Sequence, residues 1–144
     1  MGTQQTIITV QTKVNVPVEK AWFYFTTPSA VTRWNHASDD WHCPAATSEL
    51  KPGGKFCYTM ASKDGSMSFD FEGTYTEVIP HKSLKYEIAD GRKVSVLFKE
   101  TNGETEVLTT FDAENQNPAD MQQAGWQAIL DSFKAFAEKS YGRG

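Results

Sequence analysis

The residues with the most varied chemistry lie close together, at positions 34–43. This segment combines imidazole, carboxylate, thiol and indole groups, in Trp34, His36, Asp39, Asp40, Trp41, His42 and Cys43. Histidine, aspartate and cysteine can bind zinc, but their spacing here matches no established zinc pattern, so we expect no structural metal. Either histidine can act as a general acid or base, because imidazole titrates near neutral pH. The sequence names no fixed partner for either ring.

The neighbours His42 and Cys43 have the residue types of a base and a nucleophile. Adjacent residues rarely point at each other, however, so we favour a structural interpretation of the segment. In it, the polar groups lie at a rim, and Trp34 and Trp41 close one end of the core. Cys43 and Cys57 are not in CxxC spacing, which in a domain of this size is typical of reduced thiols.

A second set of candidates is aromatic and lies in alternating segments. One face of the segments 55–61, 67–78, 84–88 and 94–98 carries Phe56, Tyr58, Phe69, Phe71, Tyr75, Tyr86 and Phe98. Alternation with a period of two predicts half-buried strands. Asp70 and Glu72 then point to the opposite face, unless the register slips by one residue. Gly73 leaves a gap in the aromatic face.

Residues 117–141 predict a long helix that packs on these strands. Asn117 can cap its first turn, and Pro118 can occupy the first helical position. Apolar residues recur at three- and four-residue spacing, namely Trp126, Ile129, Leu130, Phe133, Phe136 and Ala137. Gly125 removes a side chain from this segment, as Gly73 does from its strand. Either gap can leave room for a ligand.

The remaining pattern completes the order of elements. Residues 6–16 alternate as a first strand, one short helix begins at Pro17 and stops at Pro28, and a second runs over 29–35, capped by Ser29. Residues 36–50 predict a long irregular connection, with a possible extra strand at 47–50. Tight turns such as Asn102–Gly103 separate the later strands. We predict an α+β fold, with one curved antiparallel sheet of about six strands wrapped around the long C-terminal helix.

Length and composition favour a single domain at residues 1–144, with a core at about 6–141 and a frayed tail at 142–144. The chain has 144 residues, 39% of them hydrophobic and 12% aromatic, and a net charge of −4. It has no basic run that indicates nucleic-acid binding, and no apolar segment long enough for a membrane span or a signal peptide. We therefore expect a cytoplasmic protein that binds no nucleic acid.

Five segments, in this order, resemble the START-like helix-grip (SRPBCC) superfamily. They are PVEKAWFYFTTPSAVTRW, KPGGKFCYTM, FEGTYTEVIPHKSLKYEI, NGETEVLTTF and AGWQAILDSFKAF. The resemblance is closest to the branch of the C-terminal domain of the activator of the heat-shock chaperone ATPase. The superfamily includes lipid carriers, hormone receptors, polyketide cyclases and chaperone co-factors, so the resemblance implies a shape rather than an activity.

The resemblance implies a cavity between the sheet and the long helix that can hold an apolar small molecule. Its candidate lining is Trp34, Trp41, Phe56, Tyr58, Phe69, Phe71, Tyr86, Phe98, Trp126, Ile129 and Phe133. We place its mouth near Trp34 and Trp41, on the irregular connection. The same residues are also compatible with a filled aromatic core.

Three functions are compatible with these observations. The first, which we favour, is the binding of a hydrophobic or amphipathic small molecule, and for it we predict no cofactor and no catalytic residue. The second is a protein-interaction domain of the chaperone-activator type. The full activator carries a further N-terminal domain, whereas only about five residues precede the first strand here. The third is a polyketide-cyclase-like enzyme, for which the lining offers mainly Tyr58, Tyr75 and Tyr86.

Overall fold

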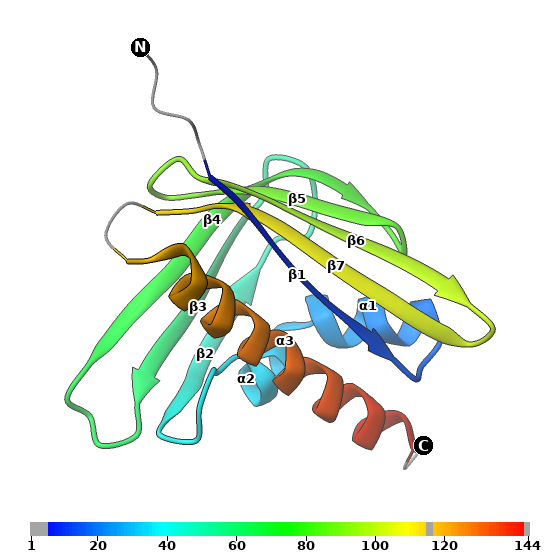
Figure 1. Cartoon of the computed structure of the whole chain (residues 1–144), viewed down its shortest axis with the longest axis horizontal. Helices are drawn as coiled ribbons and strands as arrows, with labels where there is room; N and C mark the ends of the chain where they lie inside the picture. Colours follow the sequence, from blue (N-terminus) through cyan, green and yellow to red (C-terminus); the bar gives the residue numbers. More distant parts are fainter. Residues whose placement is uncertain (1–5, 115–116, 143–144) are drawn as a thin grey trace.

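The computed structural model describes residues 6–114 and 117–142 (Figure 1). Apart from β2, which the sequence indicated only as a possible strand at 47–50, the elements follow the predicted order. They are β1 (Ile7–Val14), α1 (Val18–Thr26), α2 (Pro28–Trp34), β2 (Trp41–Ser48), β3 (Lys55–Ser62), β4 (Ser68–Ile79), β5 (Ser83–Ile88), β6 (Lys93–Thr101), β7 (Glu104–Asp112) and α3 (Ala119–Gly142). Of the expected frayed tail, Gly142 belongs to α3, and residues 143 and 144 lie outside the described residues. None of the helices in the described ranges has the length and apolar character needed to cross a membrane.

The described strands form one antiparallel sheet of seven strands in the order β1-β7-β6-β5-β4-β3-β2. The strands β2 to β7 form a meander, and β1 joins it beside β7, so β1 and β2 are the two edges. The sheet curls, and α3 crosses its concave side with α1 and α2 next to it (Figure 1). The predicted α+β helix-grip architecture is confirmed.

The irregular connection predicted at residues 36–50 is wrong in part, because β2 forms at Trp41–Ser48. β2 pairs with β3, and the register shifts between His42 and Ala45. Pro44 lies in this stretch and has no N–H to donate, and both prolines and bulges are typical of edge strands. The shift interrupts the two-residue alternation. The sequence therefore indicated only the end of this strand, since the possible extra strand predicted at 47–50 overlaps β2 at Thr47 and Ser48.

The two short helices meet at Thr27 and Pro28. α1 follows Pro17 as predicted, and ends at Thr26. Pro28 was predicted to separate the two helices, but it is the first residue of α2. At this position the backbone N–H of a helix has no partner within the helix, so proline loses no hydrogen bond. Thr27 therefore occupies the N-cap position that the sequence assigned to Ser29, although its side chain makes no capping hydrogen bond.

The core lies between the concave face of the sheet and the helices. Successive residues of β7 point to opposite faces of the sheet, so every second side chain is buried. The buried residues are Thr105, Val107, Thr109 and Phe111. Leu130, Phe133 and Ala137 form the buried stripe of α3, at three- and four-residue spacing. The ring of Phe133 lies 5.2 Å from that of Phe25 and 5.1 Å from that of Trp34, so it joins α3 to both short helices.

α3 begins at Ala119, slightly later than predicted. The backbone N–H of Gln122 donates to the carbonyl of Pro118, so Pro118 rather than Asn117 has the N-cap position. Asn117 instead donates to the carboxylate of Glu114, through its side chain at 2.9 Å. The buried amide of Gln122 donates to the carbonyls of Asn117 and Glu114, at 2.8 and 3.1 Å. These bonds connect Glu114 and Asn117 to the first turn of α3.

Side chains of α3 cover the free edge of β1. The amides of Gln123 and Gln127 donate to the carbonyls of Thr9 and Gln11, at 3.1 and 2.9 Å. Four residues of helix and two residues of strand both advance by roughly 6–7 Å, so these side chains meet alternate carbonyls. An uncovered edge strand would present unpaired groups to other chains. The contacts also fix the position of α3 along the sheet.

Gly73 leaves no gap, and the expectation that it makes room for a ligand is wrong. A Cβ at this position would lie 2.5 Å from the carbonyl oxygen of Glu87 and 2.9 Å from Cε2 of Phe56. The glycine thus allows close packing of the Phe56 ring on the sheet. At Gly125, by contrast, no atom beyond its chain neighbours and the adjacent backbone of its own helix lies within 4 Å of such a Cβ.

Asp64 organises the turn between β3 and β4. Its carboxylate accepts hydrogen bonds from the hydroxyl and the N–H of Ser66, at 2.6 and 2.9 Å, and from the Ser62 hydroxyl at 2.8 Å. These bonds, above all those from Ser66, lower the pKa of Asp64 from 3.8 to about 2. Because the pKa is lower in the folded protein than in the unfolded chain, ionised Asp64 stabilises the fold at pH values above 3.8. This stabilisation is lost as the pH falls from 3.8 through about 2.

We expect an NMR titration of the Asp64 carboxyl carbon to give a midpoint near 2. Ser66→Ala should raise that midpoint toward 3.8, because it removes the strongest of the hydrogen bonds to the carboxylate. Ser68→Ala, at the start of β4, is the matched control and should leave it unchanged. A wild-type midpoint at the ordinary value would contradict this account of the turn.

Candidate ligand cavity

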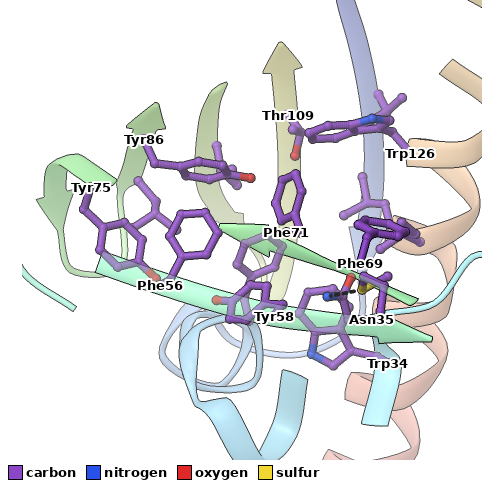
Figure 2. A pocket seen from close by; sticks show the side chains of 17 residues that line it. Trp34, Asn35, Phe56, Tyr58, Phe69, Phe71, Tyr75, Tyr86, Thr109 and Trp126 are labelled. Carbon is purple, nitrogen blue, oxygen red and sulfur yellow. Dashed lines mark hydrogen bonds between the residues drawn. The ribbon is translucent and has the colours of Figure 1, made fainter. Parts of the chain in front are cut away.

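A cavity of about 140 Å³ lies between the concave face of the sheet and the first half of α3 (Figure 2). It is lined by Val10, Phe25, Trp34, Asn35, Phe56, Tyr58, Met60, Phe69, Phe71, Tyr75, Leu84, Tyr86, Val96, Thr109, Trp126, Ile129 and Leu130. These residues come from all three helices and from every strand except β2. None of them carries a charge at neutral pH.

Aromatic rings close one end of the cavity around Phe56. Its ring centroid lies 4.9 Å from that of Tyr86, 5.1 Å from that of Tyr58 and 5.2 Å from that of Tyr75. Phe71 lies 5.8 Å away on the neighbouring strand. Tilted and edge-to-face contacts at such distances are the favoured aromatic geometry, so this wall is well packed.

Trp126 forms the wall on the side of α3. One face of its indole stacks on Phe111 of β7, with centroids 3.8 Å apart and planes inclined by 13°. Its ring also meets that of Phe71 edge-to-face at 6.0 Å. Trp126 and Ile129 remain half-buried, unlike Leu130. We conclude that this part of the apolar face of α3 borders the cavity, whereas the part around Phe133 is packed core.

Four of the described lining residues carry a hydroxyl group, namely Tyr58, Tyr75, Tyr86 and Thr109. The hydroxyls of Tyr75 and Ser48 form a hydrogen bond of 2.7 Å at the closed end. Burial raises the pKa of Tyr58, Tyr75 and Tyr86 above that of a free phenol, although the bond from Ser48 partly offsets this for Tyr75. All three phenols are therefore neutral at physiological pH and can donate a hydrogen bond.

Asn35 is the amide in the lining, and it lies just after α2 with only 7% of its surface exposed. Its Nδ2 donates to Sδ of Met60 at 3.2 Å and lies 3.9 Å from Sγ of Cys43. Sulfur is a weak acceptor, so these contacts orient the amide without strong bonds. The alternation of the sequence gave no sign of Asn35, because it follows a helix end.

The structure separates His42 from Cys43. Cys43 is buried, and His42 on the same strand is exposed, because successive residues of a strand point to opposite faces. The Cys43 thiol donates to the carbonyl of Ala45, and burial raises its pKa, which disfavours the thiolate. The pair is therefore not arranged as a nucleophile and base. Cys43 and Cys57 are both free thiols.

The polar side chains of residues 36–40 do not line the cavity. His36 is half-buried, and Asp39 and Asp40 are exposed. Within the described ranges, the one set of three side chains close enough to share a metal is Cys57, Asp70 and Glu72. Asp70 and Glu72 are exposed, as the predicted register requires, so this set lies on the outer face of the sheet.

The cavity brings together most of the residues proposed from the sequence. Those that line it are Trp34, Phe56, Tyr58, Phe69, Phe71, Tyr86, Trp126 and Ile129. Trp41, Phe98 and Phe133 do not. Trp41 packs outside on Phe69, Phe98 packs against Trp22 of α1, and Phe133 fills the space between the helices.

Several lining residues are not among the candidates predicted from the sequence. They are Val10, Phe25, Asn35, Met60, Tyr75, Leu84, Val96, Thr109 and Leu130. Tyr75 and Met60 lie on the same alternating strand faces as the aromatic residues predicted to line the cavity. The sequence pattern therefore contained enough information to include them. Thr109 has an inward position on β7, but a threonine in an alternating strand does not indicate a cavity.

The cavity reaches the surface beside Phe69. This residue lines the cavity, yet 53% of its surface is exposed. The ring of Trp41 lies 6.0 Å from that of Phe69. Trp34 is only 4% exposed, so it borders the cavity from inside rather than at its opening.

Comparisons with known proteins agree with the fold and with the sequence resemblance. Residues 15–138 match the sequence profile of the family described as Activator of Hsp90 ATPase homolog 1-like protein. No curated protein matches the chain.

Two solution structures are similar in sequence as well as in fold. An AHSA1-like protein from Aeromonas hydrophila is 42% identical, with a TM-score of 0.89 over 94% of both chains. A protein from Cytophaga hutchinsonii is 47% identical, with a TM-score of 0.79 over 95% of both chains. A crystal structure from Nitrosomonas europaea, 17% identical with a TM-score of 0.81, covers 94% of this chain and 96% of its own and shares the fold alone. The chain therefore belongs to the Activator of Hsp90 ATPase homolog 1-like family, within the START-like helix-grip superfamily.

Proposed function

We propose that this protein binds an uncharged, largely apolar small molecule, with an aromatic or acyl body, in the cavity beneath α3. The observation that carries the proposal is an aromatic cavity of about 140 Å³ whose described lining includes no charged side chain. Binding sites for small molecules are mostly apolar, with a few polar groups that fix orientation. The hydroxyls of Tyr58, Tyr75 and Tyr86 fit that description.

The size of the cavity limits the ligand. An engineered protein cavity of about 150 Å³ binds benzene. The space of about 140 Å³ here therefore suits one aromatic ring with a short substituent, or an acyl segment of similar volume. A longer molecule would extend past Phe69, where the cavity opens.

The absence of charge in the lining also restricts the ligand. An ionised carboxylate buried without a partner pays a large desolvation cost. A fatty-acid head group would have to remain outside, beside Phe69, whereas a neutral ester, ketone or phenol can enter whole.

The other two hypotheses have less support. A cyclase needs a group in the cavity that titrates near neutral pH, and Tyr58, Tyr75 and Tyr86 have pKa values raised above that of a free phenol. Binding to a chaperone rests on the name of the family. It becomes the better hypothesis if the cavity proves unable to bind small molecules.

A thermal-shift screen tests the proposal. The panel contains neutral one-ring and two-ring aromatic compounds, short acyl esters, and the anions benzoate and octanoate. A ligand at a hundredfold excess over its Kd should stabilise the fold by about 2.7 kcal/mol. We expect neutral compounds to raise the melting temperature and benzoate to leave it unchanged.

Ile129→Trp provides the matched variant, because Ile129 borders the cavity and a larger ring would fill it. We expect the variant to fold and to lose the ligand-induced shift. Ile79→Trp places the same ring at an exposed position at the end of β4 and should retain the shift. The proposal fails if no neutral compound stabilises the wild type, or if Ile129→Trp responds as the wild type does.

A further inference from the structure

Within the described residues, the cavity lining includes the hydroxyl groups of Thr109 and Tyr86, for which the protein provides no hydrogen-bond partner. Thr109 is 5% exposed, and neither its hydroxyl nor that of Tyr86 makes a hydrogen bond within the described part of the chain. Among the described residues, every fully buried side-chain oxygen or nitrogen has a hydrogen-bond partner, so these two hydroxyls are not fully buried. Both residues line the cavity, and Figure 2 shows their hydroxyls at its surface.

The sheet brings the two hydroxyls toward the same space. Val96 of β6 pairs with Leu84 on one side and with Thr109 on the other, and Tyr86 follows Leu84 on the same face. Adjacent strands lie about 4.8 Å apart, so β5 and β7 are separated by roughly 10 Å, much of which a tyrosine side chain spans. Figure 2 shows the Tyr86 hydroxyl directed across the cavity toward the strand of Thr109, whose hydroxyl points inward.

We propose that Tyr86 and Thr109 form the polar end of the cavity and together bind an uncharged carbonyl oxygen of the ligand. This inference rests on the proposed function and specifies its ligand as an aromatic ketone, aldehyde or ester. Both hydroxyls can donate, and a carbonyl oxygen has two lone pairs to accept from them. The phenol of Tyr86 retains its proton at physiological pH, because burial raises its pKa.

The neighbouring groups favour a carbonyl over other polar functions. Phe71 and Trp126 flank this end of the cavity and suit a planar ring next to the carbonyl (Figure 2). A carboxylate would find no cation among the described lining residues. A pure hydrocarbon would leave both hydroxyls buried without a hydrogen bond. The free-energy cost of a buried polar group without a partner is larger than the net free energy that one hydrogen bond contributes.

The test compares three small molecules that share a phenyl ring: acetophenone, ethylbenzene and benzoate. Affinities are measured by ligand-observed NMR with the full chain and corrected for the transfer of each compound from water. We expect acetophenone to bind roughly tenfold more tightly than ethylbenzene after that correction, the contribution of a well-formed buried hydrogen bond. Benzoate should bind most weakly.

The variant Tyr86→Phe/Thr109→Val removes both hydroxyls and keeps the shapes of the side chains. It should bind ethylbenzene at least as well as the wild type and lose the roughly tenfold preference for acetophenone. Tyr24→Phe/Thr110→Val is the chemical control, since neither residue lines the cavity, and it should keep the preference. In the infrared spectrum, the carbonyl stretch of bound acetophenone should lie lower in the wild type than in the cavity variant.

The outcomes separate this inference from the proposed function. If ethylbenzene and acetophenone bind equally well to both proteins, and the carbonyl stretch is the same in each, the carbonyl site is refuted while the binding function stands. If neither compound binds the wild type, and the thermal-shift panel gives no stabiliser, both proposals are refuted.

Discussion

Phe133→Ala is expected to lower the free energy of unfolding by about 3–5 kcal/mol, the largest effect of any substitution considered for this chain. Phe133 is 0% exposed and lies at the centre of α3. Its ring meets Phe25 of α1 and Trp34 of α2 edge-to-face, so its removal leaves a void shared by three helices. The surroundings can collapse only in part, because α3 is also held along the edge of β1.

Chemical denaturation monitored by circular dichroism measures this loss. Phe23→Ala is the matched control, because Phe23 on α1 is 53% exposed and its truncation should cost less than about 1 kcal/mol. A cost of under about 1 kcal/mol at Phe133 would mean that its ring is not packed as described. Because Phe133 does not line the cavity, the result also tests the core independently of any ligand.

Gly73→Ala is expected to cost about 3 kcal/mol, the upper part of the range for overpacked sites. The new Cβ would lie 2.5 Å from the Glu87 carbonyl oxygen, which belongs to the backbone of β5 and cannot rotate away. It would also lie 2.9 Å from the ring of Phe56, which packs against four neighbouring rings. The substitution should therefore shift the wall of the cavity as well as the sheet.

Gly125→Ala makes the same chemical change where the structure has space, and we expect the opposite sign. It should stabilise the fold by up to about 1 kcal/mol, since alanine is favoured over glycine inside a helix. Denaturant unfolding of the two variants side by side gives the comparison. If Gly73→Ala were as stable as the wild type, the close approach of Phe56 to β4 would be wrong.

Much of the architecture follows from local patterns in the sequence. Two-residue alternation predicted the strands that became β1 and β3 to β7, and the spacing around Leu130 and Phe133 predicted α3. These periods arise from the geometry of strand and helix themselves, so a short segment suffices to reveal them. Most of β2 was missed because its register shifts around Pro44, and the possible strand predicted at 47–50 covers only its last two residues.

The sequence by itself determined that aromatic side chains from the strands would face aromatic and aliphatic side chains from α3. Only the tertiary structure decided which of them border a cavity and which fill the core. Phe98 and Phe133 point inward like Phe56 and Trp126, but α1 and α2 lie beside them and occupy the adjacent space. Thr109 and Asn35 gain their positions from the curl of the sheet and the end of α2. Local periodicity gives the face on which a side chain lies, whereas the packing of distant elements decides what lies opposite it.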